Sequence, residues 1–264
     1  MTLVELLVVV GTLAVSSLLL LPTLAQARTG THAFVCQNNL RQLLSCLTLY
    51  AADNRDFLPG NFQSDGPGQW VAGDMGSRLD ATNTALLTNF NSSGLARYTG
   101  AATNLYHCPA DSSTVTWGNQ SYPRMRSVSM NGAVGTAGGQ PALPGFWLDG
   151  SFSPTASSSN WRVYPRLADM VAPTPAGLFV FTEEDPSTIN DGALAVTMGL
   201  PQWVDRPATF HNYGCVFGFA DGHAETHQWQ DTSTRCPNPP VVAQLTGATN
   251  DIGWLQKRVS ARIY

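Results

Sequence analysis

The apolar segment at the start of the chain limits the fold more than any other feature of the sequence. The first 25 residues read MTLVELLVVVGTLAVSSLLLLPTLA, and Glu5 is the only charged side chain among them. As a helix, the about 20 residues from Leu6 to Ala25 would be roughly 30 Å long, enough to cross the hydrocarbon core of a bilayer. A carboxylate near the start of such a span costs roughly 2.5–3.5 kcal/mol in lipid, so Glu5 is a candidate functional residue.

Two ordinary interpretations of this segment stay open, a secretory signal peptide and a plain membrane anchor. A signal peptide begins with basic residues and has an apolar core of roughly 7–15 residues. Here no Lys or Arg precedes the apolar run, and the run is longer than that. Ala25-Gln26-Ala27 is nevertheless compatible with a cleavage site.

The helix predicted for the apolar segment continues beyond it. Residues 28–52 place Leu40, Leu43, Leu44 and Leu47 at spacings of mainly three and four, which is typical of an amphipathic helix with one buried stripe. Pro22 removes a backbone hydrogen bond and is expected to kink the helix or open it locally. We therefore expect one long, interrupted helix over residues 2–52, of which residues 1–25 form a membrane or filament core.

The remaining residues, 53–264, predict a globular head built of short strands and turns. Asp221-Gly222 stands between two apolar runs and is a strong hairpin signal. The other strand candidates are residues 70–73, 105–108, 126–130 and 177–182. The expected fold class is α+β: a long N-terminal α-helix, apolar in its first half and amphipathic in its second, packed on a C-terminal antiparallel β-sheet domain with long loops.

Composition narrows the function classes. Charged residues make up 12% of the 264 residues, about half the usual share, and the formal net charge is −4. A chain with this charge balance does not suggest nucleic acid as a partner. A polar but uncharged surface is common in cell-surface proteins, and low charge also suits packing into a dense polymer.

The spacing of the five cysteines argues against a common metal motif. No C-x-x-C pair occurs, which disfavours a zinc ribbon or a thioredoxin-type centre. If the domain is exported, one or two disulfides are plausible. Cys36 and Cys46 on one continuous helix would lie about 15 Å apart along its axis, too far to bridge.

A group of histidines and acids lies near the C-terminus. His211 is followed, after nine residues, by Asp221 and Gly222. Further along the same segment are His223, Glu225 and His227. Such a set resembles a metal or acid–base cluster, but neither H-E-x-x-H nor G-x-S-x-G occurs. The favoured interpretation is a hairpin in which His211, Asp221 and Gly222 are structural; metal binding remains an alternative, no catalytic residue is assigned, and no enzyme is predicted.

An acidic loop is the better candidate for a metal. Its four carboxylates are Glu183, Glu184, Asp185 and Asp191. Hard oxygen ligands in a flexible loop suit Ca²⁺. The alternative is a solvated turn, since Asp185-Pro186 and Asp191-Gly192 are turn pairs. Calcium is thus a candidate ligand, and no cofactor is expected to be required.

Several motifs together carry a resemblance to a known family. They are MTLVELL at Met1, CQNNLRQL at Cys36, CPAD at Cys108, SVSMN at Ser127, EEDPSTINDG at Glu183, FHN at Phe210 and FADGHAE at Phe219. This pattern resembles the type IV pilin-like and pseudopilin proteins that have a prepilin-type N-terminal cleavage/methylation segment and a C-terminal H-x9-D-G domain. The resemblance covers nearly the whole chain.

The resemblance implies roles for particular residues. Met1 stands where the family has its processed, N-methylated residue, usually Phe. Glu5 would pair with the N-terminal ammonium of a neighbouring subunit; Thr2 would assist by hydrogen bonding, and Pro22 would allow local melting on assembly. It also implies a Cys36–Cys108 disulfide, with Cys215–Cys236 as a weaker second pair and Cys46 free.

The function implied is that of a major pilin-like structural subunit that polymerises through its N-terminal helix into an extracellular type IV pilus-like or pseudopilus filament. Alternatives are a minor or tip pilin that binds a surface or glycan, and a pseudopilin of a type II secretion system. The expected partners are copies of the chain, the inner membrane before assembly, a prepilin peptidase and methylase, and the assembly machinery. The expected location is the cell surface, with an inner-membrane pool.

Overall fold

The computed structural model describes residues 2–61, 68–137, 145–150, 158–235 and 249–263, without the side chains of residues 17–29. Its helices are α1 (Leu3–Asp53), α2 (Ala85–Thr88), α3 (Ala96–Thr99) and α4 (Asn250–Val259), with short 3-10 turns η1 (Asp80–Thr82), η2 (Thr103–Tyr106), η3 (Leu167–Asp169) and η4 (Pro175–Gly177). Its strands are β1 (Thr114–Trp117), β2 (Gln120–Pro123), β3 (Val128–Asn131), β4 (Phe179–Glu183), β5 (Ala193–Leu194), β6 (Gly214–Phe219) and β7 (Ala224–Gln228).

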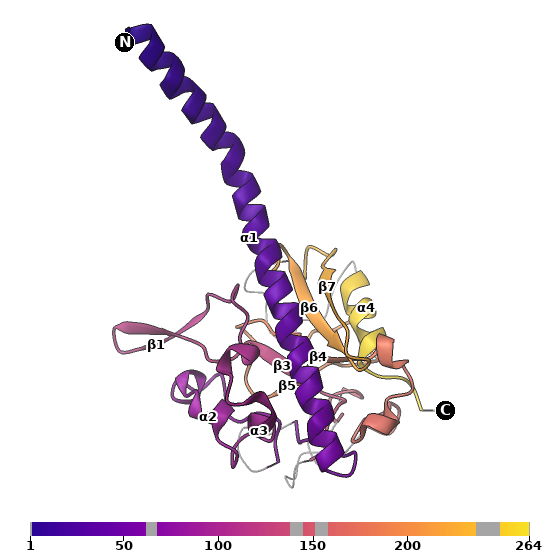
Figure 1. Ribbon diagram of the computed structural model, residues 1–264. Helices are drawn as coiled ribbons and strands as arrows, with labels where there is room; N and C mark the ends of the chain where they lie inside the picture. Colours follow the sequence, from indigo (N-terminus) through magenta and orange to yellow (C-terminus); the bar gives the residue numbers. More distant parts are fainter. Residues whose placement is uncertain (1, 62–67, 138–144, 151–157, 236–248, 264) are drawn as a thin grey trace.

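A five-stranded sheet in the order β5-β3-β4-β6-β7 forms the centre of the body (Figure 1). Neighbouring strands are antiparallel except β3 and β5, which are parallel. The β6–β7 hairpin turns at Asp221-Gly222, where Gly222 has φ +92°, so the hairpin prediction is confirmed. Strands β1 and β2 form a separate hairpin that stands away from the body (Figure 1).

The second part of α1 covers one face of this sheet (Figure 1). Leu40, Leu43, Leu44 and Leu47 are buried at 0–5% exposure, as the stripe of apolar spacings predicts. The helix approaches β6 closely because the facing position is Gly218, where an added Cβ would lie 3.0 Å from Leu44 Cδ1. Helix α4 packs on the hairpin from another side, and its Trp254 ring lies 3.6 Å from the His227 ring.

The predicted fold class needs a correction, because the described side chains do not show one continuous long helix packed on an antiparallel sheet. The first stretch with described side chains is short, ending at residue 16, and its side chains are exposed instead of packed on the body. Residues 17–29, including Pro22, lie outside the described side chains. The sheet is mixed, since β5 joins its edge in parallel to β3. The chain is α+β, with residues from about 36 onward making the helix–sheet contact.

Two predicted strands are also absent from the described residues. Residues 70–71 form a bend, residues 72–73 have no regular structure, and residues 105–106 end the turn η2. In both places an apolar run was expected to be a strand, but its side chains fill the core from a loop. Trp70, for example, is fully buried and packs on Phe181 of β4 with ring centroids 5.1 Å apart.

Candidate functional site

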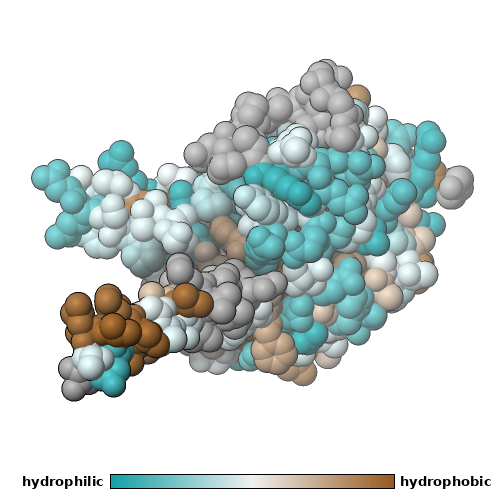
Figure 2. All heavy atoms as spheres, turned by 90° about the horizontal axis from the view of Figure 1, so that it is seen from above, coloured by the Kyte–Doolittle hydropathy of each residue, from teal (hydrophilic) through white to brown (hydrophobic). Residues whose placement is uncertain are grey.

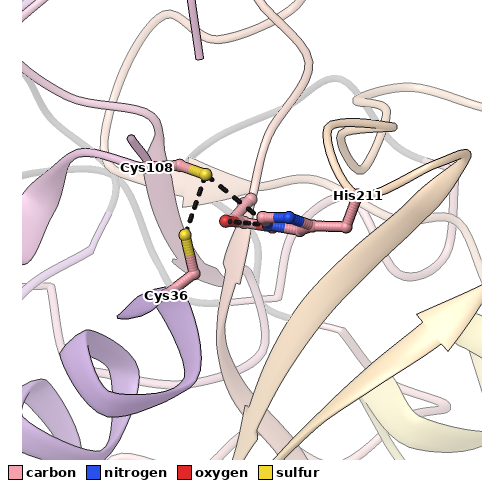
Figure 3. Close-up of side chains that lie close together, drawn as sticks. Cys36, Cys108 and His211 are labelled. Carbon is pink, nitrogen blue, oxygen red and sulfur yellow. Dashed lines mark hydrogen bonds and ion pairs between the residues drawn. The ribbon is translucent and has the colours of Figure 1, made fainter. Parts of the chain in front are cut away.

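Four side chains from distant parts of the chain meet under α1. They are Cys36, Cys108, Glu183 and His211, and their ligand-type atoms all lie within 4.8 Å of one another. Cys36 Sγ lies 2.8 Å from Cys108 Sγ, Cys108 Sγ lies 3.5 Å from His211 Nε2, and His211 Nε2 lies 2.9 Å from Glu183 Oε1. Figure 3 shows both cysteines and the imidazole of His211 turned toward one point. Within the described part of the chain, no other group of three or more such side chains lies close enough to share an ion.

The two cysteines are positioned by the elements before them. Cys36 opens the buried stripe of α1 and is 3% exposed. Cys108 follows η2, and its backbone N–H donates to Ser127 Oγ at 2.7 Å, which joins it to the segment entering β3. The thiol of Cys108 also accepts from the backbone N–H of Ala110 at 3.4 Å. The sulfur of Cys108 is therefore held from its own loop.

Glu183 and His211 are also positioned by hydrogen bonds to the backbone. Glu183 ends β4, and its Oε2 accepts from the backbone N–H of Val216 in β6 at 3.0 Å. That contact leaves Oε1 directed at His211. His211 exchanges backbone hydrogen bonds with Gly214 in a tight turn, in which Asn212 and Tyr213 have φ values of 53° and 61°.

Glu183 and His211 form a buried ion pair. Burial alone raises the pKa of Glu183, but the hydrogen bond and charge of His211 outweigh it, and the pKa is lowered. Burial likewise lowers the pKa of His211, but its contacts with Cys108 and Glu183 raise the value to about 10. Both groups are thus charged at neutral pH, and the Cys36 thiol, whose pKa the Cys108 hydrogen bond and burial raise, is protonated.

Cys36 and Cys108, the cysteines of the first implied disulfide, lie side by side in the structure, but both are free thiols. The Cys36–Cys108 bond therefore stays a prediction. Cys215 is buried beside Thr182, and Cys236 lies outside the described residues, so the second pair has no structural account. Cys46 is a free thiol 3.3 Å from the carbonyl oxygen of Tyr98.

The four acids of the predicted calcium loop are divided between different environments. Glu183 points to His211, whereas Glu184 points to Ser129 on the other face of the sheet. Asp185 accepts from Ser187 within its own turn, and Asp191 accepts from the backbone N–H of Ala193. In the described structure these four carboxylates do not come together as a set of metal ligands. The calcium site therefore stays a prediction that this geometry does not support.

The histidines and acids of the C-terminal segment are divided as well. Asp221 and His223 pair with each other at the hairpin turn, where Asp221 Oδ1 lies 2.5 Å from His223 Nδ1. His227 is stacked on Trp254, and Glu225 is exposed. His211 meets none of them, so the H-x9-D-G segment is one structural hairpin whose histidine serves a separate, buried cluster.

Two of the predicted assembly residues, Thr2 and Glu5, lie at the N-terminal end of α1. Thr2 caps the helix: its Oγ1 accepts from the backbone N–H of Glu5 at 3.3 Å, and its own N–H donates to Glu5 Oε2 at 2.7 Å. Such a reciprocal pair satisfies two helix-start donors. Met1 and the side chain of Pro22 lie outside the described residues. Over the part of the chain that is described, no helix has both the length and the apolarity needed to span a bilayer.

The four side chains of the cluster are shielded from solvent, since their residues are only 0–3% exposed. The sequence pattern missed the combination because its members belong to four separate motifs. One signal was present in the sequence: Glu183 directly follows the apolar run of Phe179, Val180 and Phe181 with only Thr182 between, and the structure buries all five residues.

Comparison with known proteins adds no family. No family model, no curated protein and no solved structure matches this chain.

Proposed function

We propose that this chain is a pilin-like structural subunit that assembles into an extracellular filament through its apolar N-terminal segment. One observation carries the proposal. In residues 3–15 the large apolar side chains are exposed on every side of the helix, for example Leu3 at 74%, Leu7 at 62% and Val10 at 55%. Figure 2 shows these apolar atoms gathered at the free end of α1.

An all-round apolar helix is stable only when it is covered. An exposed apolar patch of this kind marks an interaction site with a protein or a membrane. In the proposal, copies of the same segment are the final cover, and lipid is the cover before assembly. Glu5 favours copies, because its carboxylate is costly in lipid but can meet an ammonium group in a helix bundle.

The capping contact refines the part assigned to Glu5. In the single chain, Glu5 Oε2 already accepts from the Thr2 N–H, and the helix start is positive in partial charge. A neighbouring ammonium would therefore compete with, or share, this local contact. The proposed partners, namely the membrane pool, the peptidase and methylase, and the assembly machinery, follow from the same role.

A tip or adhesive role is the second candidate, favoured by the β1–β2 hairpin. This hairpin stands away from the body and carries Trp117 at 54% exposure and Tyr122 at 38%. Exposed aromatic rings are suited to stacking on sugars. Abundance separates the two roles, since a major subunit dominates purified filaments and a tip subunit is a trace component.

The test is electron microscopy of material sheared from cells that express the full chain. We expect filaments built from the wild-type chain, and their loss in Leu7→Glu and Glu5→Lys. Leu200→Glu, at a residue of 48% exposure in the body, is the matched control and should leave filaments intact. Because residues 5 and 7 lie outside the packed body, the melting temperature of the body should be the same in Glu5→Lys and Leu7→Glu as in the wild type. Bare wild-type monomers, or normal filaments from both N-terminal variants, would refute the proposal.

A further inference from the structure

We propose that the cluster of Cys36, Cys108, Glu183 and His211 is a zinc site that clamps α1 to the sheet. This proposal is independent of filament formation, because it is based only on the buried cluster.

The donor set is the first step of the argument. Two sulfurs, one imidazole nitrogen and one carboxylate oxygen are the atoms that bind Zn²⁺ in proteins. Thiolate ligands disfavour Ca²⁺ and Mg²⁺, which take oxygen ligands, so the cluster is a different kind of site from the one predicted for the acidic loop.

The geometry is the second step. With Zn–S distances of about 2.3 Å and Zn–N or Zn–O distances of about 2.0 Å, the edges of a tetrahedral site are about 3.3–3.8 Å. The corresponding distances here are 2.8 Å between the sulfurs, 3.5 Å from sulfur to nitrogen and 2.9 Å from nitrogen to oxygen. Side-chain shifts of about 1 Å would therefore place all four atoms around one ion.

The surroundings are the third step. Ligating groups in metal sites are usually oriented by further hydrogen bonds. Here the Val216 N–H holds Glu183 Oε2, and the Ala110 N–H donates to Cys108 Sγ. His211 Nε2 faces the cluster, so the imidazole presents this nitrogen to the site. Its Nδ1 is buried without a hydrogen-bond partner among the described residues, so the orienting hydrogen bonds come to Glu183 and Cys108 and not to the imidazole.

The charge balance is that of a structural zinc site. Binding Zn²⁺ releases the proton of each thiol and one proton from the imidazolium. The ligands are then two thiolates, a neutral imidazole and a carboxylate, with a total charge of −3, and the site including the ion has a net charge of −1. Four protein ligands and no open position are typical of a structural site. The ion would join the helix α1, the loop after η2, the end of β4 and the segment before β6.

Oxidation of Cys36 and Cys108 to a disulfide is the competing state, because it would remove both thiolates. The experiment uses the full chain, isolated from its native cells in the presence of a thiol-blocking reagent. We expect about one zinc per chain by native mass spectrometry and elemental analysis. A chain that carries the Cys36–Cys108 disulfide and no zinc would overturn the proposal.

A second measurement identifies the ligands. Co²⁺ is added to the reduced, metal-free chain, and we expect a thiolate-to-metal absorption band and the visible bands of a tetrahedral site. Cys36→Ser and Cys108→Ser should weaken Zn²⁺ binding at least 100-fold, whereas Cys46→Ser, at another buried cysteine of the same helix, should bind as the wild type does. If all three variants bind Zn²⁺ equally, or if the wild type gives no thiolate band, the assignment is wrong. The wild-type spectrum decides the matter even if a serine variant fails to fold.

Discussion

His211 Nε2 lies 2.9 Å from Glu183 Oε1, and the two side chains are 2% and 1% exposed. This contact joins the histidine of the H-x9-D-G segment to the first acid of the predicted calcium loop, 28 residues earlier. A second histidine of the segment, His223, also pairs with an acid, but His223 and Asp221 are 40% and 37% exposed. A histidine therefore pairs with a carboxylate twice in this part of the chain, once in the core and once at the surface.

Replacing His211 or His223 by alanine should lower the free energy of unfolding by very different amounts. His211→Ala leaves the Glu183 carboxylate buried without its partner, and we expect a loss of about 3–5 kcal/mol in the free energy of unfolding. His223→Ala breaks a pair screened by solvent and should cost less than about 1 kcal/mol. Urea unfolding with a chelator present measures both without a metal contribution. Similar losses in the two variants would show that burial does not set the strength of these pairs.

Substituting two glycines that have positive φ should distinguish the cost of backbone strain from the cost of steric overlap. Gly135 has φ +110°, and an added Cβ would lie 2.7 Å from the Pro59 carbonyl oxygen. Gly222 has φ +92° in the hairpin turn, and an added Cβ there would meet nothing within 4 Å. We expect Gly222→Ala to cost about 1–2 kcal/mol from strain alone, and Gly135→Ala about 2–4 kcal/mol from strain and overlap. Thermal unfolding of both variants tests this order, and a costlier Gly222→Ala would contradict it.

Asp191 should make the stability of the fold depend on pH. Burial raises its pKa to about 6, although the Ala193 N–H and the charge of Arg126 oppose the shift. Because the folded chain holds this proton more tightly than the unfolded chain, the stabilisation is complete below about pH 4 and is lost as pH rises through about 6.

Asp191→Asn removes this titration and keeps an acceptor for the Ala193 N–H. Between pH 4 and pH 7 the variant should gain about 1–2 kcal/mol relative to the wild type. Glu225→Gln, at an exposed position of β7, is the control and should follow the wild-type pH profile. Denaturant unfolding at a series of pH values measures the slopes; parallel slopes for Asp191→Asn and the wild type would refute this prediction.

The C-terminal helix α4 should depend on a reciprocal pair of aspartates. The Asp251 carboxylate accepts from the backbone N–H groups of Gln230 and Asp231, and Asp231 Oδ2 accepts from the Asp251 N–H. Asp251 is 1% exposed, so Asp251→Ala leaves the backbone N–H groups of Gln230 and Asp231 without an acceptor. We expect this to lower the free energy of unfolding by about 2–4 kcal/mol. Lys257→Ala, at an exposed position of the same helix, should cost less than about 0.5 kcal/mol. Hydrogen exchange on α4 gives the local effect, and unchanged protection in Asp251→Ala would argue against the pair.

Local pattern was sufficient for several elements. The spacing of Leu40, Leu43 and Leu47 predicted the buried face of α1, and Asp221-Gly222 predicted the β6–β7 turn. Both signals depend on neighbours within a few residues, because helix periodicity and turn geometry are local properties of the backbone. The apolar character of residues 3–15 also follows from the residue types alone.

Only the tertiary structure decided the contents of the buried cluster. Glu183 and Glu184 are adjacent in the sequence, but successive strand residues point to opposite faces, so one meets His211 and the other meets Ser129. The parallel addition of β5 depends on which segments pack side by side. The resemblance had implied that Cys36 and Cys108 pair, but it did not place Glu183 and His211 beside them. Residue types and local spacing determined the helix stripe, the turn and the apolar end of this chain, whereas long-range packing chose the partners of each buried polar group, because those contacts join segments with no shared local pattern.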